Sequence, residues 1–211
     1  MIQVGRHNIG PGKAPFVIAE VGSNWHNIEE CFKSIDAAHK CGASAVKFQA
    51  FTFGALYGMG KSMMPPTYNG KDYEMPMDWI PQLKNRADSV GIEFMCTAFD
   101  ANTMRAIDPY VNAHKIASGD INYVELLESA ARMRKPVFVS TGGTTEGGIC
   151  LAMSMLSGVS VILNYCVAAY PAKDANLFVI DELKKIVPVV GFSDHSTNFT
   201  YLPLAAIKLH G

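Results

Sequence analysis

Two lysines of this 211-residue chain stand inside segments that are otherwise apolar. Lys47 lies in "AVKFQAF" and Lys115 lies in "HKIASG", and both segments have the composition of buried strands. A buried ammonium group costs several kcal/mol of stability unless a partner compensates its charge. Two such cations in one pocket therefore need a shared anion, preferably one with more than one charge. The alternative is that both lysines extend to solvent or pair with Glu20 and Asp120.

Hydroxyl groups accompany these lysines along the sequence. Ser118 follows Lys115 in the same segment, and Ser140 and Thr141 open the sequence "STGG" at the end of the next apolar run. Hydroxyl groups and the main-chain amides of a glycine-rich turn are good donors to phosphate oxygens. The two lysines and these hydroxyls together predict a phosphate-binding site, with ion pairs inside the chain as the competing interpretation.

A carboxylate and a histidine add further chemistry. Glu20, in "IAEVG", is a candidate base or a group that binds a sugar hydroxyl, and an ion pair with Lys47 is compatible with either role. His195 stands in "GFSDHS", where the Asp194 carboxylate or a neighbouring hydroxyl could fix the ring for metal binding. A purely structural role is an equal alternative for His195. Trp25, in the loop after Glu20, gives no reason to prefer function over packing.

These side chains need rigid elements to position them, and the sequence alternates short apolar runs with amphipathic stretches. Continuous apolar runs are typical of parallel strands that are covered on both faces. Strands are predicted over residues 16–22, 45–51, 92–99, 114–119, 136–143, 159–166 and 189–196. Helices are predicted over residues 28–42, 77–91, 101–110, 123–135, 145–158, 176–187 and 200–211.

The positions of the polar residues select one α/β architecture. Polar residues recur at or near the carboxyl ends of the predicted strands: Glu20, Lys47, Gln49, Thr97, Lys115, Ser118, Ser140, Thr141, Tyr170 and His195. A site built from the ends of many strands is the arrangement of a TIM (β/α)8-type barrel. A Rossmann fold would place GxGxxG after the first strand, where "AEVGSNWHN" stands. We therefore predict a barrel with seven βα units, in which the missing eighth strand would leave two exposed strand edges.

Two further segments have distinct expected roles. Residues 1–14 are predicted to form a hairpin that caps an incomplete barrel over residues 15–211. Residues 57–74, rich in Gly, Pro and Met, form the one long loop, which is either a lid over the barrel mouth or a surface excursion.

Composition limits the class of protein. Hydrophobic residues make up 49% and charged residues 18% of the chain, a balance typical of soluble globular enzymes. The net charge of −1 gives no basic surface for nucleic acid, and no apolar stretch is long enough to span a membrane. Five scattered cysteines without CxxC spacing favour reduced thiols, so we expect a cytoplasmic protein.

Six longer segments occur in order along nearly the whole chain: "FVIAEVGSNWHN", "CGASAVKFQAF", "FMCTAFD", "HKIASGDINYVELLESAARMRKPVFVSTGG", "NYCVAAYPAKDANLFVIDELKK" and "VGFSDHS". Together they resemble the N-acetylneuraminate (sialic acid) synthase family, which includes the related pseudaminic and legionaminic acid synthases. The resemblance implies a barrel that condenses phosphoenolpyruvate with the open-chain aldehyde of an N-acetylated sugar such as N-acetylmannosamine. The products are a nine-carbon 2-keto sugar acid and phosphate.

The resemblance also implies roles for particular residues. Glu20, Lys47, Lys115 and Asp120 match catalytic positions, and Asp120 replaces the family's usual glutamate. His195 matches the first of two metal-binding histidines, for a divalent cation, Mn²⁺ or Mg²⁺, that polarises the aldehyde. The residues that match substrate-binding positions are Gln49, Thr97, Ser118, Ser140, Thr141 and Tyr170.

Three departures from the family pattern keep alternatives open. Ala168 replaces a small polar residue, and the family's "NHNG" loop reads "NWHN" over residues 24–27. The second metal histidine, the eighth strand and an antifreeze-like domain are expected beyond Gly211. In the family that domain supplies an arginine to the sugar site of the partner subunit, and a full-length form is expected to be a homodimer. A non-catalytic barrel that binds a phosphorylated or acidic sugar is one alternative. Another is a different phosphoenolpyruvate-condensing synthase that makes a keto-deoxy sugar acid.

Overall fold

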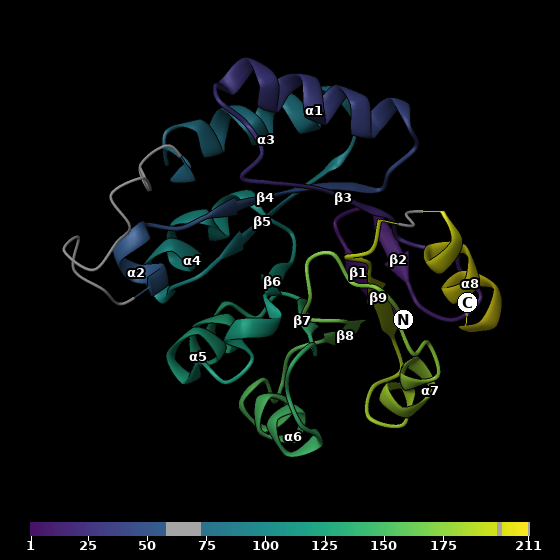
Figure 1. Cartoon of the computed structure of the whole chain (residues 1–211). Helices are drawn as coiled ribbons and strands as arrows, with labels where there is room; N and C mark the ends of the chain where they lie inside the picture. The colour runs from purple at the N-terminus through teal and green to yellow at the C-terminus, as the bar shows by residue number, and fades with distance from the viewer. Residues whose placement is uncertain (58–72, 198–199, 211) are drawn as a thin grey trace. The chain divides into compact units, whose positions relative to one another are not determined.

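The computed structural model of the chain describes residues 1–57, 73–197 and 200–210 (Figure 1). The chain divides into two compact units, one formed by Phe16–His114 and the other by Met1–Pro15 with Lys115–Gly211. Most of the long loop predicted over residues 57–74 lies outside the described residues, so its role as a lid stays a prediction.

The unit Phe16–His114 is built on a parallel three-stranded sheet. Its strands follow the order β3 (Ile18–Gly22), β4 (Ala45–Ala50) and β5 (Glu93–Ala98). Phe48 and Phe94 lie within this sheet with ring centroids 6.1 Å apart, and both are almost fully buried. The continuous apolar runs that predicted these strands therefore correspond to strands buried in the core.

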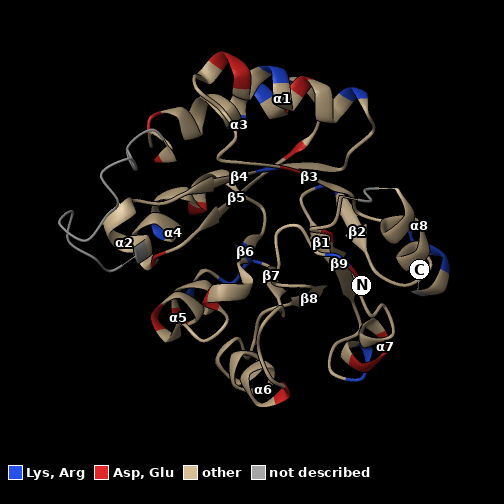
Figure 2. Cartoon of the chain, in the orientation of Figure 1, with Lys and Arg blue, Asp and Glu red and all other residues tan. Residues whose placement is uncertain are grey.

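Helix α1 (Ile28–Lys40) forms where the sequence supplies both a cap and an apolar stripe. The Asn27 side chain caps its first turn by accepting a hydrogen bond from Glu30 N at 3.0 Å. Cys31, Ile35 and Ala38, spaced at helical intervals, are buried. Acidic residues at the start of α1 and basic residues at its end suit the helix dipole, and both signs of charge are visible along it in Figure 2.

Helix α3 (Trp79–Val90) lies beside α1 and packs on β5. The Arg86 guanidinium donates two hydrogen bonds to Asp36 of α1, Nε to Oδ1 at 2.9 Å and a terminal nitrogen to Oδ2 at 2.5 Å. This pairing holds the pKa of Asp36 below its usual value. The same unit contains the short helix α2 (Phe53–Tyr57), helix α4 (Ala101–Ile107) and the 3-10 helix η3 (Asp108–Tyr110).

The second unit begins with an antiparallel pair, β1 (Ile2–Val4) and β2 (His7–Ile9). Gly10, which follows β2, lies against Val189, because a Cβ atom built on Gly10 would be 3.6 Å from Val189 Cγ2. The hairpin therefore meets the chain just before β9. The predicted role of the hairpin as a cap of the barrel stays a prediction.

The second unit also contains a four-stranded sheet with neighbouring helices. Its strands follow the order β6 (His114–Ile116), β7 (Val137–Ser140), β8 (Val161–Cys166) and β9 (Val190–Ser193), and β8 pairs in parallel with both β7 and β9. The helices are α5 (Val124–Met133), α6 (Glu146–Met155), α7 (Val179–Lys184) and α8 (Tyr201–His210), and the 3-10 helix η4 (Ser118–Asp120) follows β6. All six residues of β8 are buried.

Seven strands of the described chain lie where the sequence predicts them, each followed by a helical segment. The predicted helices also form, each within its predicted range. Helix α2 was not predicted, because its five residues are too few to show a helical period. Within the described residues, no helix is long and apolar enough to cross a membrane.

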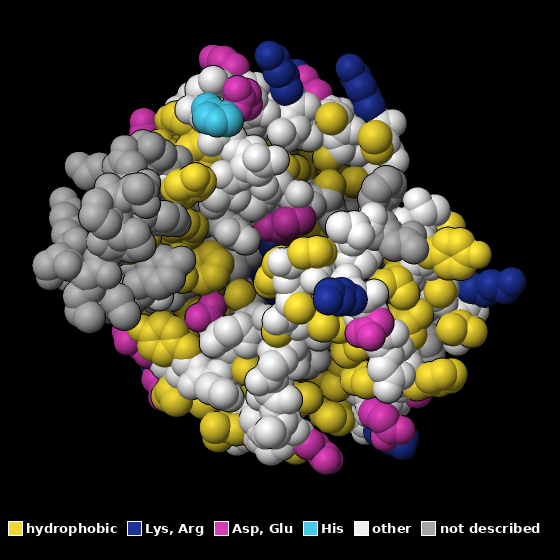
Figure 3. All heavy atoms as spheres, viewed as in Figure 1, with side chains coloured by type: hydrophobic (Ala, Val, Ile, Leu, Met, Phe, Trp, Pro, Cys, Tyr) yellow, Lys and Arg dark blue, Asp and Glu magenta, His cyan; other side chains and the backbone are white. Residues whose placement is uncertain are grey.

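Helix α8 exposes several large apolar side chains on the face drawn in Figure 3, where hydrophobic groups gather over it. Tyr201, Leu204 and Leu209 are 76%, 59% and 61% exposed. An amphipathic helix packed on a sheet normally exposes polar residues on its outer face. This helix therefore leaves an apolar surface in contact with solvent.

Candidate functional site

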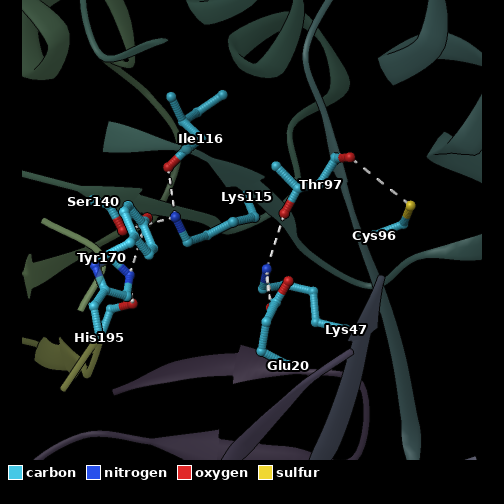
Figure 4. Close-up of polar contacts among 10 residues, drawn as sticks. Glu20, Lys47, Cys96, Thr97, Lys115, Ile116, Ser140, Tyr170 and His195 are labelled. Atoms are coloured by element: carbon cyan, nitrogen blue, oxygen red, sulfur yellow. Dashed lines mark hydrogen bonds and ion pairs between the residues drawn. The ribbon is translucent and has the colours of Figure 1, made fainter. Parts of the chain in front are cut away.

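In the unit Phe16–His114, the buried Lys47 is paired with a carboxylate. Its ammonium group forms an ion pair with Glu20 on the neighbouring strand β3 and donates a hydrogen bond to Thr97 Oγ1 at 3.0 Å (Figure 4). Glu20 and Lys47 are register partners in the sheet, so the pairing follows directly from the strand alignment. The Glu20 side chain is 43% exposed, and the carboxylate therefore remains accessible while it compensates the buried lysine.

Gln49 belongs to the same face of this sheet, two residues beyond Lys47 on β4 and in register with Thr97. Gly22, at the end of β3, has φ +63° and makes room for it. A Cβ atom built on Gly22 would lie 3.7 Å from Gln49 Cδ and 3.5 Å from Glu20 Oε1. A register shift between Glu20 and Gly22 accompanies this turn.

Cys96 lies between Met95 and Thr97 on β5 and is fully buried. Burial raises the pKa of its thiol to about 12, although the nearby Lys47 opposes the shift. A thiol that stays protonated is a poor nucleophile and a poor metal ligand. Cys96 therefore acts as a packing residue beside the Lys47 cluster.

The loop after β3 uses its side chains locally. Trp25 is buried and packs edge-on against Trp79 with ring centroids 5.4 Å apart. His26 N donates to Glu30 Oε2 at 2.9 Å, and Asn27 caps α1. The residues that depart from the family's loop pattern thus anchor the start of a helix.

In the other unit, Lys115 of β6 is held by two oxygens. Its ammonium group donates to Ser140 Oγ and to the Ile116 carbonyl, both at 2.7 Å. Both Lys115 and Ser140 are buried, and Figure 4 shows the lysine reaching across to the end of β7. Because the Ser140 oxygen accepts from the ammonium group, the hydroxyl hydrogen of Ser140 remains available to donate to a ligand.

Ser118 and Asp120 both lie on η4, directly after β6, and are partly buried. The Asp120 Oδ2 atom is buried and has no hydrogen-bond partner within the described residues. Burial raises the pKa of Asp120 to about 6, and the charge of Lys115 partly opposes this shift. A carboxyl group with this pKa exchanges its proton near neutral pH, as a general acid or base must.

The Thr141 hydroxyl donates a hydrogen bond to the main chain of β8, a use that the sequence did not indicate. Thr141 donates twice to the Asn164 carbonyl, from its main-chain nitrogen at 3.0 Å and from its hydroxyl at 3.3 Å. The next residue, Gly142, packs so closely on β8 that a Cβ atom there would lie 2.7 Å from Cys166 Sγ. The "STGG" turn is therefore fixed against β8 by hydrogen bonds and by close packing.

His195 follows β9 and has a defined tautomer. Its Nδ1 lies 2.8 Å from the Val167 carbonyl, which only accepts hydrogen bonds, so Nδ1 carries the hydrogen. In the neutral ring the lone pair is then on Nε2, which lies 3.3 Å from the Tyr170 hydroxyl and 3.4 Å from the Ser193 hydroxyl. The Tyr170 ring stacks on the imidazole with centroids 4.2 Å apart, as Figure 4 shows.

The group that orients the His195 ring is not the Asp194 carboxylate, one of the two kinds of group that the sequence suggested. The sequence offered Asp194 or a neighbouring hydroxyl as the group that fixes the ring. The Asp194 carboxylate instead accepts from Ser196, from N at 2.9 Å and from Oγ at 3.2 Å, and so closes the turn after β9. The imidazole is fixed by the carbonyl of Val167, the residue that directly follows β8.

The geometry of His195 suits a metal ligand, because an imidazole with one nitrogen held by a carbonyl can present its other nitrogen to a cation. Within the described residues, no group of three or more His, Cys, Asp and Glu side chains could hold a metal ion.

In Phe16–His114 the predicted site residues Glu20, Lys47, Gln49 and Thr97 form one group, called the Lys47 cluster. In the other unit Lys115 contacts Ser140 and acts on Asp120, which shares η4 with Ser118; these residues are called the Lys115 cluster. Tyr170 and His195 form a separate pair, and the Thr141 hydroxyl is used by the main chain of Asn164. That Lys47 and Lys115 share one anion concerns both units together and stays a prediction.

Asn164, which interrupts the apolar run of β8, is a buried polar residue that the sequence motifs did not single out. The pattern that singled out Lys47, a polar residue inside a continuous apolar strand, could also have identified Asn164. Asparagine attracts less notice there because it carries no charge.

The model of the NeuB family matches residues 34–210. This chain belongs to the NeuB family. The resemblance predicted from the sequence motifs is therefore confirmed at the level of the family. Spore coat polysaccharide biosynthesis protein SpsE of Bacillus subtilis is 34% identical, over 98% of this chain and 60% of that protein. Pseudaminic acid synthase of Campylobacter jejuni is 33% identical, over 99% of this chain and 65% of that protein.

A solved structure supports the fold of this NeuB family member. The chain superposes on N-acetylneuraminic acid synthetase of Leptospira borgpetersenii with a TM-score of 0.92 and 31% identity, over 100% of this chain and 75% of that one. The predicted fold class, an α/β fold of the TIM (β/α)8 type with seven βα units, is confirmed. The chain spans less than two thirds of the length of the two relatives named above.

Proposed function

We propose that this NeuB family member condenses phosphoenolpyruvate with the aldehyde of an N-acetylated aminosugar of the N-acetylmannosamine type. The products would be a nine-carbon 2-keto sugar acid and phosphate. The observation that carries the proposal is the buried Lys115, which donates to Ser140 at 2.7 Å at the carboxyl end of β7. An ammonium group and a hydroxyl donor held together in a buried position suit a small, multiply charged anion.

In this proposal the Lys115 cluster binds phosphoenolpyruvate. Lys115 supplies the positive charge, and the Ser140 hydroxyl donates to an oxygen of the anion. Ser118 and Thr141 flank this pair on the chain. Asp120, with its pKa raised to about 6, holds or releases a proton near the reacting anion. Because these groups are fixed before the substrate binds, they stabilise developing charge without reorganising.

In the Lys47 cluster, the Lys47 ammonium group is proposed to add positive charge to phosphoenolpyruvate binding, and Glu20 and Gln49 are proposed to bind the sugar. The Glu20 carboxylate is partly exposed although it is paired with Lys47, so it can still accept a hydrogen bond from a sugar hydroxyl. Gln49 stands beside it and offers both a donor and an acceptor. Thr97 accepts from Lys47, which leaves its own hydrogen to donate.

His195 is proposed to be a metal ligand through Nε2, with Tyr170 stacked on its ring. A divalent cation, Mn²⁺ or Mg²⁺, would polarise the sugar aldehyde when bound there. Mn²⁺ is low in the affinity order for nitrogen ligands, so one imidazole would hold it weakly. Oxygens of a bound substrate would add ligands.

The test measures phosphate release when the 211-residue chain is mixed with phosphoenolpyruvate and N-acetylmannosamine, with and without Mn²⁺. We expect metal-dependent release that His195→Ala abolishes, while its affinity for phosphoenolpyruvate remains close to that of the unaltered chain. His39→Ala, at an exposed histidine of α1, is the control. Full turnover in the His195→Ala variant would make His195 structural and remove the metal from the proposal.

Two results would favour the alternatives. Binding of an acidic sugar without phosphate release would indicate a non-catalytic barrel, for which Ala168 is the supporting residue. Phosphate release with a shorter sugar aldehyde, and none with N-acetylmannosamine, would indicate another keto-deoxy sugar acid synthase. A homodimeric form and a cytoplasmic location are further parts of the proposal.

A further inference from the structure

Asn164 occupies the centre of a row that crosses three strands. It lies on β8, in register with Ser140 of β7 on one side and with Gly191 of β9 on the other. The asparagine is 8% exposed, in a strand whose residues are all buried. Its side chain is therefore placed by the sheet and not by a flexible loop.

The Asn164 carboxamide shares a face of the sheet with Ser140. Register partners on neighbouring parallel strands direct their side chains to the same side, and successive residues of one strand alternate. A Cβ atom built on Gly191 would lie 2.6 Å from Asn164 Oδ1, which places the carboxamide directly in front of that glycine. Gly191 thus provides the space that the Asn164 side chain fills.

The opposite face of β8 is the one that α7 covers. Tyr165, next to Asn164, stacks on Phe192 with centroids 5.8 Å apart. The Tyr165 hydroxyl accepts a hydrogen bond from Asn176 N at 2.9 Å, just before α7. Asn164 therefore faces away from the helix layer, on the side where Lys115 meets Ser140.

Asn164 is held in the sheet through its main chain, because its carbonyl accepts from the Thr141 nitrogen and hydroxyl. Its carboxamide is a polar group inside a strand whose residues are all buried. A polar side chain at this position is explained if a ligand takes part in its hydrogen bonds.

The neighbouring groups indicate the chemistry of that ligand. Lys115 supplies a positive charge, and Ser140, which accepts from it, has its own hydrogen left to donate. The amide nitrogen of Asn164 adds two further donors beside Ser140 in the same row. Donors without a nearby carboxylate in the row suit the oxygens of an anion.

We propose that Asn164 donates to an oxygen of the phosphoenolpyruvate held by Lys115 and Ser140. This inference rests on the proposed function and adds a binding residue to it. Gly191 supports Asn164 by leaving space for the carboxamide, so the two residues act as a pair.

The experiment measures phosphoenolpyruvate affinity by calorimetry for the chain and two variants of similar size. Asn164→Leu removes the donors and should weaken binding roughly tenfold, the effect of losing a hydrogen bond to a charged group. Asn164→Asp keeps the shape but places a negative charge beside the anion, so a larger loss is expected. Tyr165→Phe alters the other face of β8 and should leave the affinity unchanged.

The outcomes separate this inference from the proposed function. If the unaltered chain binds phosphoenolpyruvate and both Asn164 variants bind it equally well, Asn164 is not a ligand and the proposed function stands. If the unaltered chain binds neither phosphoenolpyruvate nor inorganic phosphate, both proposals are overturned. Thermal melting confirms that each variant is folded, and if Asn164→Leu is not, Asn164→Asp decides the question.

Discussion

At the scale of single residues, the two buried lysines are compensated in different ways. Lys47 forms an ion pair with the Glu20 carboxylate, whereas Lys115 donates to the neutral oxygens of Ser140 and Ile116. Lys115 also acts on a carboxylate, because its charge partly opposes the upward shift of the Asp120 pKa.

Replacing either lysine should weaken phosphoenolpyruvate binding. We expect Lys47→Ala and Lys115→Ala each to cost about 2–4 kcal/mol, the range for removing one partner of a desolvated charge pair. Calorimetric titration measures both, with the exposed Lys40→Ala as control. Unchanged affinity in both variants would end the interpretation of these lysines as anion-binding groups.

The raised pKa of Asp120 predicts a pH-dependent effect on stability. Its pKa is about 6 in the folded chain against an ordinary value of 3.8, so the folded state retains the proton between these pH values. The stabilisation from this proton is present at low pH and is lost as the pH rises through about 6. Above that pH the folded chain holds a partly buried charged carboxylate.

Asp120→Asn should therefore melt at a higher temperature than the unaltered chain at pH about 8, and the difference should shrink as the pH falls toward about 4. Thermal melting across this range measures it, with the exposed Asp174→Asn as control. A difference between the Asp120 variant and the unaltered chain that does not change with pH would contradict the raised pKa.

A site residue could be predicted from the sequence only where its own type is unusual in its segment. Lys47, Lys115 and His195 were identified because a charge or an imidazole at the end of an apolar run is unusual. The use of the Thr141 hydroxyl depends on how β7 and β8 align, which no local pattern encodes. Asn164 is a similar case, since its importance comes from the residues on both neighbouring strands.

At the scale of elements, the turn after β7 is fixed by its contact with β8. Gly142 lies so close that a Cβ atom would be 2.7 Å from Cys166 Sγ and 3.0 Å from the Cys166 carbonyl oxygen. The main-chain oxygen cannot move without disturbing β8. The absence of a side chain at Gly142 thus sets the position of the turn that carries Ser140 and Thr141.

Gly142→Ala should destabilise the protein by about 1–3 kcal/mol, the usual cost of overpacking. It should also lower phosphoenolpyruvate affinity, because the turn must shift. Gly119→Ala is the control for stability, since a Cβ atom there meets nothing within 4 Å. Denaturant melts of both variants measure the change. Equal stability of the two would mean that the β7 turn moves freely.

The strands were predictable because seven continuous apolar runs bounded by turn residues are a strong signal for parallel strands. The ends of the helices were harder to predict from the sequence. The range 176–187 was predicted as helical, whereas α7 covers Val179–Lys184. Helix termini depend on caps and tertiary contacts that a hydrophobic period does not specify. The division into two compact units has no counterpart in the sequence pattern.

At the scale of the whole molecule, two features leave surfaces that favour association. Among the described strands, β3 pairs with β4 alone and β9 with β8 alone, so each has a side without a hydrogen-bonded strand. Helix α8 exposes Tyr201, Leu204 and Leu209 to solvent. Unpaired strand edges and contiguous apolar surface are both common causes of self-association.

We therefore expect the 211-residue chain to self-associate at micromolar concentrations, with α8 contributing to the contact. Leu204→Lys places a charge in the apolar surface of α8 and should shift the sedimentation velocity distribution toward the monomer. Leu151→Lys, at an exposed leucine of α6, changes the charge equally and should leave the distribution unaltered. The α8 surface is responsible if only the first variant dissociates. A monomeric chain with one cooperative melt would show that neither the strand edges nor α8 is available to a second copy.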